Sequence, residues 1–448
     1  MFAPCTRRRA LTLSLAPVFA ACQRLTGQPG GAETPRQPAG PLKLSLAAYA
    51  SGATVKPYET IKARFESQHP QSEVELMLFP AALGTDSLAE KIVAMTAAGT
   101  PPDVFLTIAQ LKPQWARQGM LLDLSDRVKK SSKVRPAMYY KPVVDAMLYQ
   151  GKFYGTPWGY NAMVMYLNLD LFEEKGLKTP TLGWTYDDFT ELARALTDMN
   201  RGIFGTRNHA NGATNPVFAL MYNHAGHYWV DETETRALVD SPDAVAMYEY
   251  WLRLQNVLKV TDGPQQPLPQ GKNQLDGIVG MWLSWSTEPF SILQKAKEGV
   301  VYRWKMHTWP KGPKAQTHFA QGHLWSIAQG HKAPDRAWIL AEWMGSIEAE
   351  KVWAEEHRTP PQVPDEKLWQ TYFDQLPPAE QKEAISFIVN TVYRDGYARD
   401  FQYWPTYDEC RVVMEEEVRS IFVTGTKSPK QAMSDAAQRI NAILSRNR

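Results

Sequence analysis

Residues 97–105, with the sequence AAGTPPDVF, decide the fold of this chain. Glycine followed by Thr-Pro-Pro ends a helix, because glycine accepts the left-handed turn after a helix and proline cannot continue one. The run 103–106 that follows is predicted to be a buried strand. Apolar side chains at helical spacing over 88–95 predict the helix that this turn closes.

The same alternation continues toward the N-terminus. Residues 42–46 and 74–78 alternate apolar with polar side chains, which is the period of a strand. Between them, residues 58–65 have the period of a helix and stop at His69-Pro70. The order strand, helix, strand, helix, strand predicts parallel pairing through right-handed crossovers, so the fold class is α/β.

The rest of the body has the same mixed character. A length of 448 residues exceeds what one hydrophobic core serves, so two lobes are expected. The further predicted strands are 163–167, 277–282 and 304–309. The further predicted helices are 186–196, 239–258, 335–344 and 429–444.

The first 22 residues are predicted to be an export signal. A basic segment with three arginines precedes residues 10–21, an apolar stretch too short to span a bilayer. The stretch leads into Phe-Ala-Ala-Cys, which resembles a bacterial lipobox with Phe19 in place of the usual aliphatic residue and predicts acylation of Cys22. The alternative is ordinary signal-peptidase cleavage with Cys22 incidental. Residues 23–41 are rich in glycine, proline and glutamine and are predicted to be a flexible tether.

Charge and composition exclude some classes of partner. The 49 basic and 47 acidic residues leave a net charge of +2, and no basic cluster follows the N-terminus, so no nucleic-acid partner is expected. The 15 tryptophans and 19 tyrosines suit a ligand with flat apolar faces and polar edges. Only Cys410 follows Cys22, which leaves no disulfide within the mature chain. No later apolar run is long enough to predict a transmembrane helix.

The sequence contains no recognisable catalytic or metal-binding constellation. His209, His224 and His227 have no defined convergent geometry, so neither a metal nor another cofactor is expected. A Gly-x-Ser-x-Gly elbow, a phosphate-binding Gly-Lys-Ser/Thr loop and a His-Glu-x-x-His motif are all missing. The sequence therefore predicts a binding protein and not an enzyme.

A set of short stretches resembles, in the same order, the extracellular solute-binding proteins of the maltose-binding type, family 1. Each stretch is weak alone, and their common order across residues 42–444 makes the resemblance specific. The matching stretches are 97–105, 118–124, 151–158 with Asn161, 166–172, 280–282, 309–313 and 322–327.

The resemblance implies a two-lobed periplasmic-binding-protein-like fold of type II, with discontinuous lobes joined by hinge crossings. Residues 42–155 plus 308–345 are expected in the N-terminal lobe, and residues 156–307 plus 346–448 in the C-terminal lobe. Closure of the lobes about the hinges captures the ligand. The expected crossings lie near 153–161, 304–310 and Gly345.

The resemblance also implies the partners. It predicts an exported, monomeric receptor that binds a small carbohydrate and presents it to the transmembrane subunits of an ABC permease. The membrane is reached through the N-terminal lipid on Cys22. The receptor is expected at the outer face of the cytoplasmic membrane or in the periplasm.

Two arguments locate the expected ligand site. Ligands of open α/β sheets bind outside the carboxyl ends of strands, and the resemblance places aromatic side chains in the cleft between the lobes. Two stacking tryptophans supply about 4 kcal/mol at about 25 cal/mol per Å². Micromolar binding needs about 8 kcal/mol, so polar side chains must contribute the rest. The expected ligand-binding residues are Tyr49, Ser51, Thr107, Gln110, Trp158, Asn161, Trp282, Ser284, Trp285, His323, Trp325 and Trp404.

Three alternatives remain open. A receptor for a sugar phosphate or a glycerol phosphodiester is favoured if Arg207, Arg303 or Arg358 converges on the cleft. A secreted carbohydrate-active enzyme needs two carboxylates roughly 5 to 9.5 Å apart across a cleft. A sensory or scaffold lipoprotein keeps the fold and signals instead of transporting.

Overall fold

The fold is known from a computed structural model, which describes residues 42–50, 52–80, 86–212, 215–401 and 403–446. The predicted export signal 1–22, with Cys22, lies outside these ranges. The predicted tether 23–41 and Ser51 lie outside them too.

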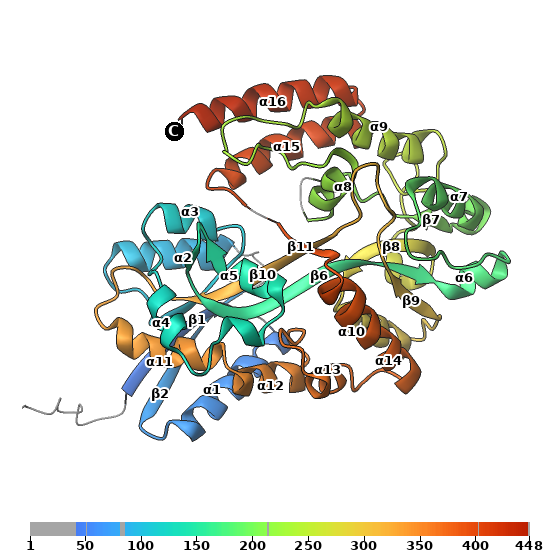
Figure 1. The fold of residues 1–448 in the computed structure, drawn as a ribbon. Coiled ribbons are helices and arrows are strands. Elements are labelled where there is room, and N and C mark those ends of the chain that lie inside the picture. Colours follow the sequence, from blue (N-terminus) through green and yellow to red (C-terminus); the bar gives the residue numbers. More distant parts are fainter. Residues whose placement is uncertain (1–41, 51, 81–85, 213–214, 402, 447–448) are drawn as a thin grey trace, which may run out of the picture. The chain divides into compact units, whose positions relative to one another are not determined.

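Strands and helices alternate along most of the described chain (Figure 1). The strands are β1 Leu42–Tyr49, β2 Ser72–Phe79, β3 Val104–Thr107, β4 Leu148–Tyr149, β5 Lys152–Phe153, β6 Thr156–Asn168, β7 Phe204–Thr206, β8 Val279–Trp285, β9 Trp304–His307, β10 His318–Ser326 and β11 Ala398–Asp400. The α-helices are α1 Lys56–Gln68, α2 Asp86–Ala97, α3 Lys112–Arg117, α4 Ser125–Lys130, α5 Lys141–Met147, α6 Leu169–Glu174, α7 Tyr186–Leu196, α8 Pro216–Ala225, α9 Pro242–Asn256, α10 Glu288–Lys297, α11 Pro334–Met344, α12 Ile347–Glu355, α13 Glu366–Tyr372, α14 Pro378–Ser386, α15 Tyr407–Phe422 and α16 Pro429–Arg446.

A large mixed sheet organises these elements. Its strands follow the order β2-β1-β3-β10-β6-β8-β7, with β11 beside β10 and β9 beside β6. Strand β1 is parallel to both β2 and β3, so the strand–helix–strand units predicted from the sequence are present. The α/β fold class is confirmed.

Strands β6 and β10 link the two ends of this sheet. The first part of β6, residues 156–162, pairs with β10, and the second part, residues 163–168, pairs with β8 and β9. Strand β10 in turn pairs with β11 near its beginning and with β3 near its end. Figure 1 shows β6 and β10 extending from the side of β1 to the side of β8. The sequence predicted a crossing between the lobes near residues 304–310. In the structure, β9 of this segment pairs with the end of β6, and β10 is the strand that links the two ends of the sheet.

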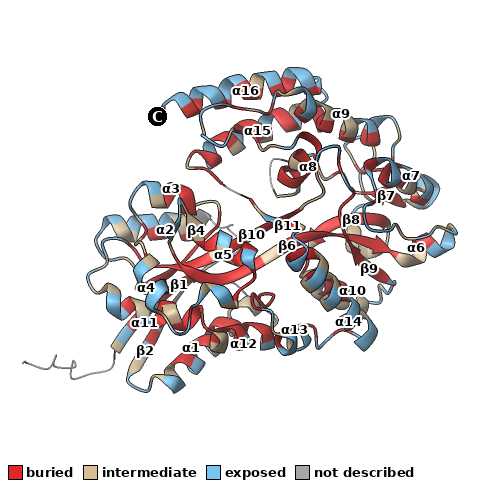
Figure 2. Cartoon of the chain, in the orientation of Figure 1, coloured by how far each residue is buried: buried red, intermediate tan, exposed pale blue. Residues whose placement is uncertain are grey.

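Three hydrophobic cores stabilise the body. One surrounds β1 to β3 and draws on residues 44–158 and 325–353, which include α11 and α12. A second surrounds α8, α9, α15 and α16. The third lies along β6 and β8 with α5 and α13. Figure 2 shows the strands buried and exposed residues on helices such as α7 and α16. Segments distant in sequence thus share each core, and the lobe boundaries stay a prediction.

Helix α7 shows how local sequence fixes an element. The Thr185 side chain accepts the N–H of Asp188, and the Asp188 carboxylate accepts the N–H of Thr185, which forms a capping box. Strand β7 packs closely against this helix at Gly205. A Cβ on Gly205 would lie 1.9 Å from the carbonyl oxygen of Ala193. Glycine is therefore required for this close approach of helix and strand.

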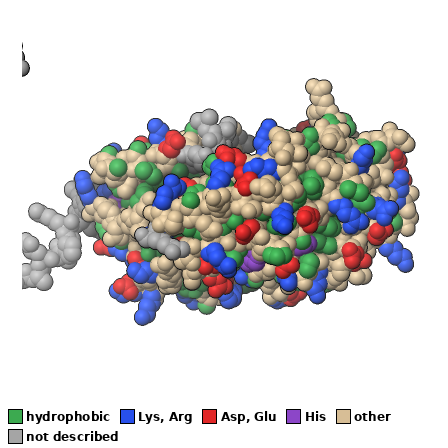
Figure 3. All heavy atoms as spheres, turned by 90° about the horizontal axis from the view of Figure 1, so that it is seen from above, with side chains coloured by type: hydrophobic (Ala, Val, Ile, Leu, Met, Phe, Trp, Pro, Cys, Tyr) green, Lys and Arg blue, Asp and Glu red, His purple; other side chains and the backbone are tan. Residues whose placement is uncertain are grey.

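The surface carries charges of both signs. Figure 3 shows Lys and Arg side chains interspersed with Asp and Glu over the face that it presents, in keeping with the net charge of +2. Within the described ranges, no helix has the length and apolar character needed to cross a membrane. Cys410 is a buried free thiol.

Candidate ligand-binding site

A bulge in β6 gives Trp158 its direction. Pro157 pairs with Leu324 and Gly159 pairs with His323, so Trp158 is an extra residue opposite one step of β10. Bulges of this kind re-aim a side chain and are common beside functional sites. The Trp158 ring stacks on the His323 ring, with centroids 5.5 Å apart and planes inclined by 28°.

The end of α12 brings Arg358 to the same place. His357 adopts a left-handed conformation with a φ of 52°, and its N–H donates to the carbonyl of Ala354. The N–H of Arg358 donates to the carbonyl of Trp353. These two bonds form a Schellman motif, which fixes the path of the chain leaving a helix. The guanidinium carbon of Arg358 lies 5.2 Å from the centroid of the Trp158 ring.

Gly159 permits this approach of the chain to β6. A Cβ on Gly159 would lie 2.9 Å from Cγ2 of Thr359, the residue that follows Arg358. A larger residue at position 159 would push this segment away from the strand. The glycine therefore helps to hold Arg358 over Trp158.

We call Tyr49, Trp158, His323 and Arg358 the Trp158 cluster. Tyr49, at the carboxyl end of β1, meets the Trp158 ring edge-on at 6.1 Å. Nδ1 of His323 accepts the N–H of Ala109 at 3.0 Å, which leaves the proton of the neutral ring on Nε2. Burial, helped by the charge of Arg358, lowers the pKa of His323 to about 4. Burial raises the pKa of Tyr49, and Arg358 opposes that shift.

Two hydrogen-bonded pairs extend the polar surface along β6 and β10. Oδ1 of Asn161 accepts a hydrogen bond from the hydroxyl of Ser286 at 2.5 Å. Ser286 is the residue that directly follows β8. Gln321, directly opposite Asn161, accepts through Oε1 from the hydroxyl of Tyr403 at 2.9 Å. Side chains alternate along a strand, so Gln321 and His323 lie on one face of β10. The pairs therefore continue the surface on which His323 lies.

The structure brings one part of the predicted site together. Tyr49, Trp158 and His323 are in contact, and Asn161 lies further along the same pair of strands. Gln110, which follows β3, has a buried Oε1 for which the described residues supply no hydrogen-bond partner. These predicted residues surround the junction of β3, β6 and β10.

The predicted residues at the end of β8 lie beside Ser286. Trp285 is half-buried and meets Phe319 edge-on at 5.9 Å. Ser284 is buried, and its side chain lowers the pKa of the Glu288 carboxyl against the larger effect of burial. Trp285 thus has an accessible part beside Asn161, whereas Ser284 is buried.

Three other predicted residues are packed in the cores, and Trp158 is itself only 5% exposed and belongs to the β1 to β3 core. Trp282 is fully buried and stacks on Tyr166, with centroids 5.4 Å apart. Trp325 is also fully buried, so neither tryptophan offers an exposed ring face. Thr107 is buried and donates to a serine hydroxyl of β10 at 2.8 Å. Ser51 cannot be placed, since it lies outside the described residues.

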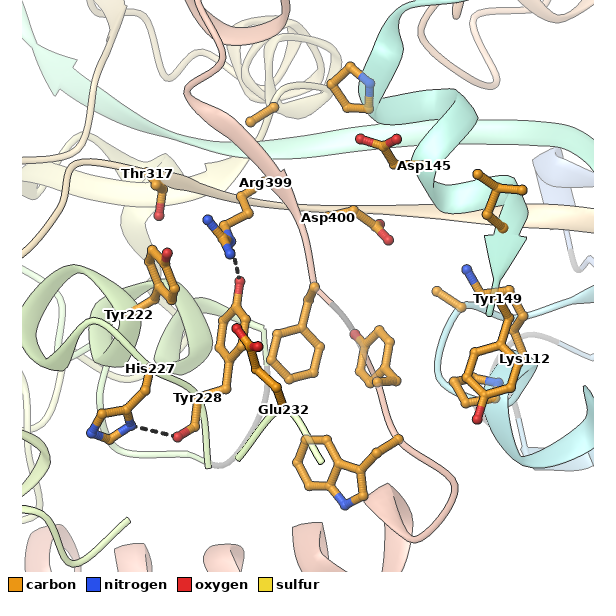
Figure 4. A pocket seen from close by; sticks show the side chains of 18 of the residues that line it. Lys112, Asp145, Tyr149, Tyr222, His227, Tyr228, Glu232, Thr317, Arg399 and Asp400 are labelled. Atoms are coloured by element: carbon orange, nitrogen blue, oxygen red, sulfur yellow. Dashed lines mark hydrogen bonds between the residues drawn. The ribbon is translucent and has the colours of Figure 1, made fainter. Parts of the chain in front are cut away.

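Trp404 lies in the wall of a groove of about 1010 Å³. This groove runs along β10 between the end of β3 and β11, and Figure 4 shows Asp145, Asp400 and Lys112 around it. Ala109 and Tyr403 also line it, and these two residues bond to His323 and Gln321. The groove therefore borders the surface that carries the Trp158 cluster.

Neighbouring groups engage most of the groove's charges. The Lys112 ammonium is buried and donates to the carbonyl of Ala146 at 2.6 Å, and burial lowers its pKa. Burial raises the pKa of Asp400 to about 7, against the opposing charge of Lys112. Nε of Arg399 donates to the hydroxyl of Tyr228 at 3.0 Å (Figure 4). The groove is thus polar and partly self-satisfied.

Sequence reasoning missed Gln321 and Ser286 as members of the site. A signal for Gln321 was present, since strand alternation places it on the same face as His323. Ser286 directly follows Trp285, at a strand end where ligand groups are expected. Arg358 was considered only for a phosphorylated ligand, because no local pattern shows that the end of α12 returns to β6.

The comparisons with known proteins bear on the family and the fold. The sequence profile of the bacterial extracellular solute-binding proteins matches residues 60–374. The chain belongs to this family. A binding protein of Brucella abortus is 23% identical to this solute-binding protein over 427 residues, which cover 91% of this chain and 94% of the relative. An ABC transporter extracellular-binding protein of Pyrococcus horikoshii is 26% identical over 147 residues, 33% of this chain and 32% of the relative.

Solved structures share the fold of this solute-binding protein. The ABC substrate-binding protein of Listeria monocytogenes in complex with cycloalternan superposes with a TM-score of 0.73 at 19% identity, covering 90% of this chain and 99% of that chain. A sugar transporter protein of Rhizobium etli in an open conformation gives 0.72 at 18%, with coverages of 89% and 99%. Maltose-bound MalE3 of T. maritima gives 0.70 at 18%, with coverages of 90% and 99%. The type II periplasmic-binding-protein-like fold is confirmed.

Proposed function

We propose that this solute-binding protein is an exported receptor that captures a carbohydrate at the Trp158 cluster and delivers it to an ABC importer. The cluster, with the Asn161–Ser286 and Gln321–Tyr403 pairs, is the observation that carries the proposal. Aromatic rings beside hydrogen-bonding groups suit the apolar faces and hydroxyl edges of a sugar.

The position of these groups in the sheet supports the proposal. Tyr49 ends β1 and Trp285 ends β8, and ligands of open α/β sheets bind outside the carboxyl ends of strands. Three solved proteins of the same fold carry sugars in their described complexes: cycloalternan, maltose and alpha-D-tagatose. Both lines of support point to the same class of ligand.

Capture follows from the linking strands. The groups that we assign to the ligand lie on or beside β6 and β10, which connect the β1 to β3 part of the sheet with the β8 part. A ligand that contacts both parts favours the closed arrangement by its extra contacts there. Closure then gives the importer a bound state to recognise.

The ligand test is a thermal-shift screen of mono- and oligosaccharides, followed by titration calorimetry of each hit. A ligand at a concentration of 100 times its Kd adds about 2.7 kcal/mol to the free energy of unfolding. We expect Trp285→Ala to weaken binding by about 2 kcal/mol, roughly 30-fold in Kd, if it removes one stacking face. The matched control is Trp338→Ala, on half-buried Trp338 of α11, which packs against the β1 to β3 core. Equal losses in the two variants, or a screen without hits, would refute the proposal.

A secreted carbohydrate-active enzyme remains the second candidate. Asp145 and Asp400 both line the groove, and the pKa of Asp400 is raised to about 7, as a general acid requires. Asp145, however, is held by Lys141, whose ammonium lies 2.5 Å from its carboxylate. A product assay on each hit of the screen separates the candidates, because turnover that Asp400→Asn abolishes identifies an enzyme.

The membrane attachment is a separate part of the proposal. We assign residues 1–22 to an export signal and Cys22 to lipid acylation, which attaches the receptor to the membrane beside the permease. We also propose that the receptor acts as a monomer. Mass spectrometry of the mature N-terminus tests this directly. An acylated cysteine is expected, and Cys22→Ser should release the protein from the membrane fraction. An unmodified N-terminus after cleavage would contradict the assignment.

A further inference from the structure

We propose that the ligand is an acidic sugar or polyol, whose single oxyanion, a carboxylate or a phosphate, binds the guanidinium of Arg358. The inference rests on the proposed function and names its substrate class.

Arg358 differs from the two other arginines considered from the sequence. Arg207 pairs with Asp262 at 2.9 Å. Arg303 pairs with Asp170 at 2.6 Å on the surface. Among the side chains that the structure describes, no carboxylate lies within 4.0 Å of the Arg358 guanidinium.

Nearby acidic residues of the chain are already engaged. Glu355 lies 3.7 Å from the guanidinium of Arg64, and Glu356 lies 3.1 Å from the ammonium of Lys56. The ends of α12 and α1 thus share these charges with each other. Arg358 is left as a half-buried cation without an internal counter-ion in the described part of the chain.

The groups around Arg358 are neutral. Its guanidinium stands over the Trp158 ring, and its charge opposes the rise that burial causes in the pKa of Tyr49 and of Tyr58. His323 is neutral at neutral pH, since burial lowers its pKa to about 4. Burying a charge is costly unless an opposite charge accompanies it. An anionic ligand would supply that charge on binding.

Unfilled hydrogen-bonding capacity points the same way. Nε of Arg358 is buried and has no acceptor among the described atoms. A guanidinium offers five N–H donors in a planar fork, which matches a carboxylate or phosphate with two parallel bonds. The buried Oε1 of Gln110 also lacks a donor. Gln110 adjoins Ala109, whose N–H holds His323. One free cationic donor and one free acceptor suit an anion that also carries hydroxyls.

The test is titration calorimetry of the purified protein with matched pairs of ligands. The carboxylate arm compares D-glucuronate with D-glucose and D-galacturonate with D-galactose. The phosphate arm compares glucose 6-phosphate with glucose and glycerol 3-phosphate with glycerol. We expect the acidic member of at least one pair to bind at least tenfold more tightly. Its affinity should fall when the salt concentration rises, because screening weakens charge pairing.

Variants of Arg358 assign the preference to this side chain. Arg358→Gln should remove the preference for the acidic member while leaving a neutral parent bound. Arg358→Lys should restore only part of it, since an ammonium keeps the charge but loses the planar fork. Arg303→Gln is the matched control, because Arg303 is exposed and ion-paired elsewhere, and it should leave all affinities unchanged.

Each outcome decides between the two claims. Equal affinities for acidic and neutral members, or a preference that survives Arg358→Gln, would overturn the inference and leave the receptor proposal standing. If no sugar of either kind binds, both claims fail. If Arg358→Gln does not fold, the comparison of acidic with neutral ligands on the unmodified protein still decides.

Discussion

The carboxyl group of Glu350 offers a sharp test of the packing around α12. Glu350 is 1% exposed and accepts the backbone N–H of Gln362 at 3.1 Å and its side-chain amide at 2.5 Å. Burial raises its pKa from the usual value of 4.5 to about 7, although both hydrogen bonds favour the charged form. The folded protein therefore holds this proton more tightly than the unfolded chain.

The sign of the pH dependence follows from that raised pKa. Below pH 4.5 the group is protonated in both states, and its full contribution to stability is present. As the pH rises through 4.5 toward 7, the unfolded chain ionises first, so stability is lost until the folded pKa is passed. The loss is about 1 kcal/mol at pH 5 and about 3 kcal/mol above pH 7, at about 1.4 kcal/mol per pKa unit.

The variant Glu350→Gln removes this titration and keeps an amide that can pair with Gln362. We expect it to be more stable than the unmodified protein by about 1 kcal/mol at pH 5 and about 3 kcal/mol at pH 8. Urea denaturation at pH 5, 6, 7 and 8 measures the difference. The buried histidines titrate in both proteins, so their effects cancel. A difference that does not grow with pH would refute the reasoning.

Three further predictions follow from single contacts. Gly205→Ala should lower the free energy of unfolding by at least about 2 kcal/mol through overpacking, because the added Cβ would lie 1.9 Å from a backbone oxygen. Gly330→Ala is the control, since a Cβ there would have no atom within 4 Å. Equal midpoints of urea denaturation for the two variants would contradict the packing. Gly159→Ala should weaken ligand binding in calorimetry more than it lowers the melting temperature, because it displaces the segment after α12. Arg117 and Glu234 form an exposed ion pair at 2.5 Å. A double-mutant cycle should therefore give a coupling free energy of less than about 1 kcal/mol for this pair. A larger coupling free energy that persists in high salt would contradict this.

Local patterns were sufficient to predict the elements with strong punctuation. For the opening stretch, α2 ends at Ala97, Gly99 has a φ of 72° and β3 begins at Val104. Each of these features depends on residues next to one another in the chain. The alternation of strand and helix periods likewise predicted the α/β fold class, which the strand order confirms.

The site could be predicted only in part, because burial and long-range approach decide it. Trp282 follows the pattern expected of a stacking platform, but strand alternation does not say which face another layer covers, and Tyr166 covers this one. The place of Arg358 depends on a left-handed His357 and on Gly159, which lies far earlier in the sequence. Neither condition leaves a signal near Arg358 itself.

A crystal structure of the protein with the best ligand of the screen shows whether the ligand binds at the Trp158 cluster. We expect a sugar in contact with Arg358, Gln321 and Trp285. A sugar seated instead in the groove between Asp400 and Trp404, away from β6, would contradict it.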